Sequence, residues 1–229
     1  MERTATAPVR PSLRERKKQL TRQAILDAAE RLFAERGYDR VTVAQIADAA
    51  NIAVKTLFTY FDSKEDLVFG GEDEMRDAIL TAVGSRPPGT SPLEAMRAFL
   101  KDLAAQDESA SGVETFHAAY GSVPQLHSRM LLMFERFEQA LAVRLAAEAA
   151  ETGATGATNG PSDPAPRLAA AQLVSLLRLI TTEEARAYIA SQPEAERGRA
   201  LREWIDQSAD LLAGGLADYA VRASVPGTE

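Results

Sequence analysis

The sequence predicts an all-α protein that consists of a small N-terminal helical domain and a larger helical domain. Apolar residues recur at helical spacing along most of the chain, and we find no segment that alternates with period two as a strand does. Helix caps and Gly/Pro-rich breaks separate these segments. With 229 residues, 45% of them hydrophobic and 26% charged, the chain can bury the core of an ordinary globular protein.

The composition excludes several classes of protein. The chain has no cysteine, which rules out disulfide scaffolds, thiolate metal sites and cysteine nucleophiles. Its N-terminus lacks the apolar core of a signal peptide, and no stretch approaches the roughly 18 apolar residues of a membrane span. We therefore expect a cytoplasmic protein with no membrane partner.

Charge is distributed unevenly. Residues 1–64 contain 12 Lys/Arg and 8 Asp/Glu, a net of +4, whereas residues 65–229 contain 14 and 25, a net of −11. The densest basic run includes Arg14, Arg16, Lys17 and Lys18. Such an asymmetry indicates a nucleic-acid partner for the basic part, although the run alone is equally typical of a solvated tail.

The first elements follow from local signals. Residues 1–12 are expected to be a disordered arm, and a helix is predicted from about Leu13. One apolar stripe marks its buried face and is formed by Ile25, Ala28, Ala29, Leu32 and Phe33. Gly37 stands where a helix usually stops.

The next helix has a complete start signal. Thr42 and Gln45 fit a capping box, and Val41 and Ile46 fit a hydrophobic staple, so we predict a helix over 43–50. Asn51 follows where the chain needs a left-handed residue to turn, a conformation that asparagine tolerates.

The stretch 54–61, VKTLFTYF, combines conflicting signals. Most of its residues are β-branched or aromatic and so favour a strand, but no partner strand is predicted nearby. As a helix, it places Leu57, Tyr60 and Phe61 on the inner face and leaves Lys55, Thr56 and Thr59 outside. We therefore predict a short helix, followed by a new helix capped near Ser63.

Helical patterns continue to the end of the chain. The predicted helices are 64–83, 93–107, 113–120, 126–151, 167–191 and 194–222, with a flexible linker at about 152–166. Gly70 and Gly71 fall inside the first of these helices and suggest a hinge, close packing or a local break. If the pair is a hinge, replacing both with alanine should stabilise the protein.

A capped helix, a tight turn and a second short helix together form a helix-turn-helix unit. In such units the second helix lies in the major groove of DNA. The outward residues of 54–60 suit that task, because Thr and Tyr hydroxyls donate to phosphates or bases, and Lys pairs with phosphate or guanine.

Residues 21–68, TRQAILDAAERLFAERGYDRVTVAQIADAANIAVKTLFTYFDSKEDLV, resemble the DNA-binding domain of the TetR family of transcriptional regulators. The resemblance implies a helix-turn-helix domain over 13–63 and a helical regulatory and dimerisation domain over 64–229. It implies that the residues contacting the DNA operator are Thr42, Val43, Val54, Lys55, Thr56, Thr59, Tyr60, Lys64 and the basic residues Arg14, Arg16, Lys17 and Lys18. Two positions depart from the family pattern, because Phe58 replaces a frequent Tyr and Ala53 replaces a capping Ser.

The resemblance also implies a ligand-responsive regulator, most simply a repressor, that binds a palindromic operator as a homodimer and is released by a small hydrophobic effector. Candidate ligand-binding residues are Met96, Phe99, Phe116, His117, Tyr120, Met130, Phe134, Phe137, Arg178 and Thr182, although ordinary core is the favoured alternative for each apolar one. Two apolar helices imply a dimer interface formed by Leu173, Leu177, Leu201, Trp204, Ile205, Leu212 and Leu216. An activator would have the same DNA-binding domain.

Two other classes remain as alternatives. One is a nucleic-acid-binding protein without operator specificity, and the other is a helical enzyme. The sequence offers no nucleophile–base set, no metal cluster and no Gly-rich phosphate loop. We therefore expect no catalytic residue, no metal and no cofactor.

Overall fold

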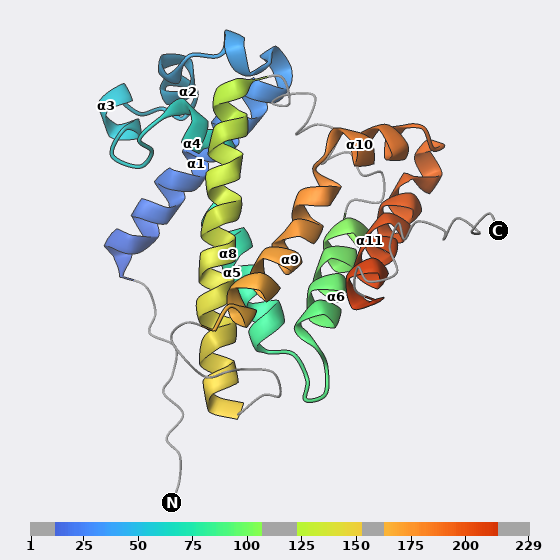
Figure 1. The fold of residues 1–229 in the computed structure, drawn as a ribbon. Helices are drawn as coiled ribbons and strands as arrows, with labels where there is room; N and C mark the ends of the chain where they lie inside the picture. The colour runs from blue at the N-terminus through green and yellow to red at the C-terminus, as the bar shows by residue number, and fades with distance from the viewer. Residues whose placement is uncertain (1–11, 107–122, 153–162, 215–229) are drawn as a thin grey trace, which may run out of the picture. The chain divides into compact units, whose positions relative to one another are not determined.

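The computed structural model describes residues 12–106, 123–152 and 163–214, and within these ranges the chain forms helices and no strand (Figure 1). It divides into two compact units, residues 1–70 and 71–229. In the described ranges, no helix combines the length and the apolar character that crossing a bilayer requires.

The N-terminal unit consists of five short elements: α1 (Leu13–Arg36), η1 (Tyr38–Arg40), α2 (Val43–Ala49), α3 (Val54–Leu57) and α4 (Lys64–Val68). Ser12 and Glu15 form a capping box at the start of α1, and Gly37 ends this helix with a φ of 79°. The predicted apolar stripe of α1 is confirmed, because all five of its members are buried.

The second unit consists of α5 (Glu72–Gly84), α6 (Pro92–Ala105), α8 (Pro124–Thr152), α9 (Ala165–Ile180), α10 (Glu183–Ala190), η2 (Glu194–Glu196) and α11 (Arg197–Gly214). The capping box of Ser91 and Glu94 fixes the start of α6, with Pro92 in its first turn. The predicted helix 113–120 and most of the predicted linker lie outside the described residues.

Two predicted helices are each divided in the structure. The segment 64–83 is not one helix, because α4 ends at Val68 and α5 begins at Glu72. The segment 167–191 is likewise α9 and α10, since the Thr182 hydroxyl accepts a hydrogen bond from the Ala185 N–H and starts a new helix. Apolar periodicity continues across both breaks, which is why the sequence pattern alone does not reveal them.

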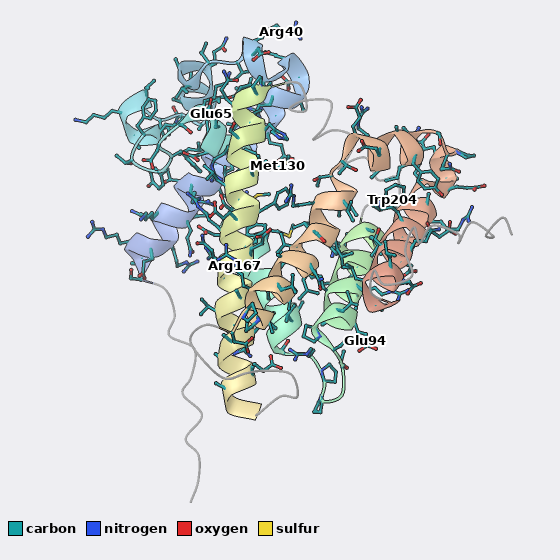
Figure 2. The ribbon with its side chains drawn as sticks, in the orientation of Figure 1. Arg40, Glu65, Glu94, Met130, Arg167 and Trp204 are labelled. Atoms are coloured by element: carbon teal, nitrogen blue, oxygen red, sulfur yellow. The ribbon has the colours of Figure 1, made fainter. Side chains whose placement is uncertain are left out.

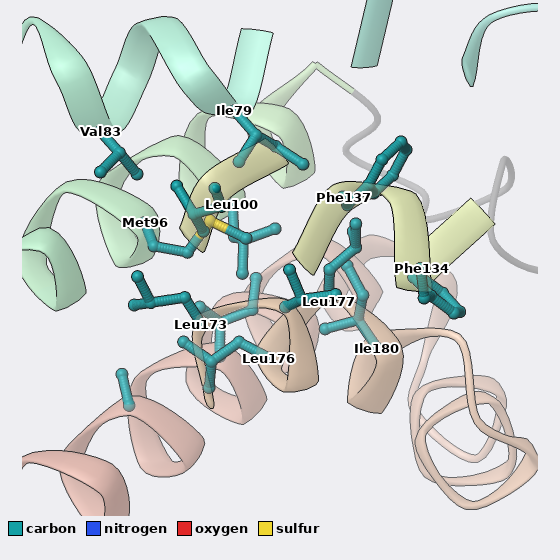
Figure 3. Close-up of a cluster of buried hydrophobic side chains, with 14 of the residues drawn as sticks. Ile79, Val83, Met96, Leu100, Phe134, Phe137, Leu173, Leu176, Leu177 and Ile180 are labelled. Atoms are coloured by element: carbon teal, nitrogen blue, oxygen red, sulfur yellow. The ribbon is translucent and has the colours of Figure 1, made fainter. Parts of the chain in front are cut away.

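One hydrophobic cluster forms the centre of the second unit (Figure 3). Helices α8 and α9 pack extensively along each other, and α11 packs on α6 and α9. The side chains of Met96, Leu100, Phe137 and Leu141 are all at most 1% exposed. Burial of such side chains contributes roughly 1.5–3 kcal/mol each, which makes this cluster the main source of stability of the unit.

Ion pairs tie neighbouring helices of the second unit together. Arg97 and Lys101 of α6 both contact Asp206 of α11, at 2.6 Å and 2.8 Å. At the start of α5, Glu72 pairs with Arg129 and Arg136 of α8. These contacts fix how each helix is positioned along its neighbour, which apolar packing alone specifies less strictly.

Gly70 packs closely within the N-terminal unit. It is buried, and a Cβ added to it would lie 2.8 Å from Cδ1 of Leu26 and closer still to Cδ2. Its carbonyl oxygen accepts a hydrogen bond of 2.6 Å from the guanidinium of Arg22. The expectation that alanine stabilises both glycine positions is therefore wrong for Gly70, where the hydrogen atom is needed for close packing.

We expect Gly70→Ala to lower the free energy of unfolding by about 1–3 kcal/mol, the usual cost of overpacking a filled site. Gly71→Ala is the matched control, because a Cβ there meets no atom within 4 Å. Urea denaturation of both variants, alone and with Leu26→Ala, measures the effect. If Gly70→Ala lowers the free energy of unfolding equally in the wild type and in Leu26→Ala, contact with the Leu26 side chain is not the cause.

A second prediction concerns acid stability. Hydrogen bonding from Arg86 lowers the pKa of Glu148 below its usual value of 4.5. The stabilisation is therefore complete above pH 4.5 and is lost as the pH falls through the lower pKa of the folded state. Glu148→Gln should cost about 1–3 kcal/mol at neutral pH, and its difference from the wild type should shrink in acid. Glu135→Gln, at an exposed position of α8, makes the same change in charge and should show neither effect.

Candidate nucleic-acid interface

The start of α2 is fixed by reciprocal hydrogen bonds. The Gln45 N–H donates to the Thr42 hydroxyl at 3.3 Å, and the Thr42 N–H donates to Gln45 Oε1 at 2.8 Å. Val41 and Ile46 are both at most 1% exposed, as a hydrophobic staple requires. Thr42 remains exposed and Val43 half-buried, so the predicted cap is confirmed and stands at the surface.

The turn after α2 is a Schellman motif. Asn51 has a φ of 54°, as predicted, and it is the one non-glycine residue with positive φ among those that the structure describes. The Ile52 N–H donates to Ala47 O and the Asn51 N–H to Asp48 O, both at 2.9 Å. These bonds satisfy the last carbonyls of α2 and direct the chain into α3.

Helix α3 has one regular turn, Val54–Leu57, rather than the predicted eight residues. Beyond it the chain continues in tight turns, where the Thr59 N–H donates to Thr56 O and the Tyr60 N–H to Leu57 O. The strand alternative is excluded for these residues. Leu57 is 0% and Phe61 5% exposed, which confirms two of the three residues predicted on the inner face, whereas Tyr60 is only half-buried.

The outer face of α3 carries both polar and apolar side chains. Lys55 and Thr59 are exposed, whereas Thr56 and Tyr60 are half-buried. The Thr59 hydroxyl donates to Thr56 O at 2.6 Å, which leaves its lone pairs as hydrogen-bond acceptors. The structure thus brings the predicted residues of 54–60 together on α3 and the turns that directly follow it.

Two apolar side chains also lie on this face. Val54 is 39% and Phe58 48% exposed. Phe58 was absent from the predicted contact residues because it lacks a hydrogen-bond donor, and its exposure is visible only in the structure. Ala53, at the N-cap, makes no side-chain cap hydrogen bond.

Lys64 makes contacts within the N-terminal unit. Its ammonium donates to Tyr38 O at 2.6 Å and lies 3.9 Å from the centroid of the Tyr38 ring. Burial lowers the pKa of Lys64, and the neighbouring Glu65 accepts a hydrogen bond of 2.9 Å from the Tyr38 hydroxyl. The ammonium thus binds the domain itself through one of its three donors, and its predicted phosphate contact stays a prediction.

The basic residues near the N-terminus lie on α1 and not on an extended arm. Arg14, Arg16, Lys17 and Lys18 are all exposed. Arg14, Lys17 and Lys18 occupy positions i, i+3 and i+4 and therefore share one side of the helix. Their backbone is helical, as the helix predicted from about Leu13 requires.

Several predicted ligand-binding residues lie in the core of the second unit. Met96, Phe134 and Phe137 are members of the hydrophobic cluster, and Phe99 and Met130 pack against it (Figures 2 and 3). The exposed Arg178 lies with its guanidinium carbon 5.8 Å from the centroid of the Phe134 ring. Phe116, His117 and Tyr120 lie outside the described residues.

Thr182 does not present a free hydroxyl. This group accepts from the Ala185 N–H at 3.3 Å and donates to Leu179 O at 2.9 Å, so it caps α10. In the part of the chain that the structure describes, no group of three or more His, Asp or Glu side chains is arranged to hold a metal ion.

Most predicted dimer-interface residues are buried within a single chain. Leu173, Leu177, Leu201 and Ile205 are at most 6% exposed and belong to the hydrophobic cluster. These side chains have almost no surface left to contact a second copy of the chain, so this part of the expected dimer interface is wrong. Trp204 and Leu212 are only partly buried (Figure 2), and Leu216 lies outside the described residues.

Comparison with known proteins agrees with this geometry. Residues 25–70, which include α2, the Schellman turn and α3, match the family described as bacterial regulatory proteins, tetR family. The HTH-type transcriptional regulator TcmR of Streptomyces glaucescens is 33% identical over 141 residues, 61% of this chain and 58% of TcmR. The HTH-type transcriptional repressor KstR of Rhodococcus jostii is 37% identical over 82 residues, 36% of this chain and 38% of KstR. The matches thus span less than two thirds of these relatives.

Solved structures share the fold over most of the chain. A putative tetR-family transcriptional regulator from Mesorhizobium loti has a TM-score of 0.52 at 20% identity and covers 85% of this chain and 97% of its own. SmeT, solved as a complex with triclosan, has a TM-score of 0.50 at 19% identity and covers 92% and 99%. The N-terminal helix-turn-helix region of the chain, residues 25–70, thus matches the tetR family of bacterial regulatory proteins.

Proposed function

We propose that this protein is a transcriptional regulator that binds a palindromic DNA operator as a homodimer, represses transcription from it, and is released by a small hydrophobic effector. The observation that carries the proposal is the exposed face of α3, held outward by a capped helix, a Schellman turn and the buried Leu57. A short helix presented in this way fits the major groove. The name of KstR as a repressor supports repression for this chain.

In this proposal the DNA contacts divide into two kinds. Lys55, Thr56, Thr59 and Tyr60 meet base edges and the flanking phosphates, with Val54 beside them. Thr42 and Val43, at the start of α2, face the DNA backbone, and Arg14, Arg16, Lys17 and Lys18 add positive charge along α1. Contacts to phosphate position the protein, whereas contacts to base edges specify the sequence.

Dimerisation follows from the size of this surface. A single short helix contacts too few base pairs to select one site, whereas two-fold symmetry doubles the contacts. Half-site centres would lie about 34–36 Å apart, or multiples of that distance.

For the interface we propose the outer side of α9, where Leu168 and Leu179 are 59% and 39% exposed. These residues are eleven positions apart, close to three helical turns, and so lie on one side.

The proposed effector would bind among the apolar side chains of the second unit. SmeT, which shares the fold, was solved with triclosan. Met96, Phe134 and Phe137 belong to the hydrophobic cluster of this unit, and Phe99 and Met130 pack against it. Arg178 is near enough to orient a polar group of the ligand. A typical coupling of roughly 1–3 kcal/mol would change operator affinity about 5- to 150-fold.

Selection of binding sites from a random DNA library by the purified protein tests the proposal. We expect enrichment of one palindromic sequence, with two protected half-sites in a footprint. Scattered protection without an enriched sequence would contradict operator recognition and support a nucleic-acid-binding protein without sequence preference.

The two lysines of the helix-turn-helix region should differ in the salt dependence of binding. Lys55→Met should reduce the slope of log affinity against log salt by about 0.9 per half-site, because one phosphate contact is lost. Lys64→Met should leave that slope unchanged and instead lower the stability of the domain by about 1–3 kcal/mol. Gel-shift titrations at several salt concentrations, together with thermal melts, measure both effects. A smaller salt slope for Lys64→Met, with unchanged stability, would show instead that Lys64 contacts DNA.

The proposed dimer interface has its own test. Replacing both Leu168 and Leu179 with Glu should shift the protein from dimer to monomer in analytical ultracentrifugation and weaken operator binding at least tenfold, because the second half-site contact is lost. Val143→Glu is the matched control, since Val143 of α8 is 71% exposed and receives the same kind of charge. A monomer produced only by Val143→Glu would move the interface to α8.

A further inference from the structure

An exposed aromatic side chain lies in the middle of the proposed DNA-binding face. Phe58 is 48% exposed, and Val54, one helical turn earlier on the same side, is 39% exposed. Lys55 and Thr59, their exposed neighbours, are polar. The two apolar side chains therefore form a small apolar patch, Val54 and Phe58, bordered by groups suited to DNA.

The backbone determines where the Phe58 ring points. The Phe58 N–H donates to Val54 O at 3.2 Å, and φ and ψ of Phe58 are −68° and −4°, which are close to helical values. Successive residues of a helix point about 100° apart. Because Leu57 is completely buried, its neighbour Phe58 is directed away from the core of the unit.

The chemistry of the major groove restricts what such a patch can recognise. The groove edges of adenine, guanine and cytosine offer only hydrogen-bonding groups, whereas thymine also presents its C5-methyl group. A phenyl ring has no donor or acceptor for a phosphate oxygen, so pressing it against the DNA backbone would leave that oxygen unpaired. The methyl group of thymine is the partner that an apolar ring can cover without loss of a hydrogen bond.

We propose that Phe58, supported by Val54, is a specificity-determining residue that packs against the C5-methyl group of one thymine in each half-site. This inference rests on the proposed operator-binding function. It assigns recognition of an A·T pair to an apolar contact, at a position where a tyrosine would donate a hydrogen bond. The neighbouring Lys55 and Thr59, which lie beside this pair on the helix, then supply the polar contacts.

The test uses the operator selected by the full-length protein, with each thymine replaced in turn by deoxyuridine, which removes only the methyl group. For the wild type we expect one thymine in each half-site whose replacement weakens binding about fourfold, the value of one buried methyl group. Phe58→Ala should bind the thymine and uracil operators equally. Thr59→Ser removes a methyl group from the adjacent side chain and should keep the fourfold difference.

The outcomes separate this inference from the function on which it rests. If a palindromic operator is selected but no thymine is sensitive to loss of its methyl group, or if Phe58→Ala keeps the sensitivity, the inference is wrong and the regulator remains. If no operator is selected, both fail. Thermal melts should show Phe58→Ala to be as stable as the wild type, because the side chain is exposed, so a lost uracil effect cannot result from unfolding.

Discussion

The burial of Leu57 is the constraint on which the proposed DNA-binding surface depends. Around it in α3, Val54 and Thr56 are poor helix formers, and each disfavours the helix by at most about 0.7 kcal/mol relative to alanine. Complete burial of one leucine contributes about 1.5–3 kcal/mol, which outweighs the propensity loss over the single turn of α3. Tertiary packing therefore stabilises this helix. The side chains on its outer face do not need to favour helix formation, so they can be residues that suit DNA binding.

Local signals are sufficient to predict α1, α2 and the turn after α2, but not the short η1. The capping box of Thr42 and Gln45, the left-handed Asn51 and the stop at Gly37 all depend on hydrogen bonds within a few residues. Such contacts involve neighbours in the sequence, so residue types at fixed spacing reveal them. The same holds for the start of α6, where Ser91 and Glu94 repeat the capping pattern.

Some features were missed because the deciding contact comes from a distant residue. Nothing near Lys64 indicates that its ammonium binds the carbonyl of Tyr38, 26 positions away, and nothing near Gly70 reveals its contact with Leu26. The apolar stripes of α9 and α11 were recognised, but periodicity cannot distinguish a face that packs within one chain from a face that packs on a second copy. Burial of Leu173 and Ile205 resolves that ambiguity in favour of the core.

That outcome bears on how an effector would act. Phe134 and Phe137, proposed to contact the ligand, and Leu173 and Leu177 of α9 belong to one continuous cluster. A ligand that enters among these side chains must displace some of them, because protein interiors are close-packed and transmit strain. Since Glu72, at the start of α5, is held by Arg129 and Arg136 of α8, a shift of α8 would be transmitted to the residues that directly follow the N-terminal unit. In this proposal, the buried leucines of α9 would carry the effect of a ligand towards the N-terminal unit, and the proposed dimer would form through the side of α9 that the core leaves exposed.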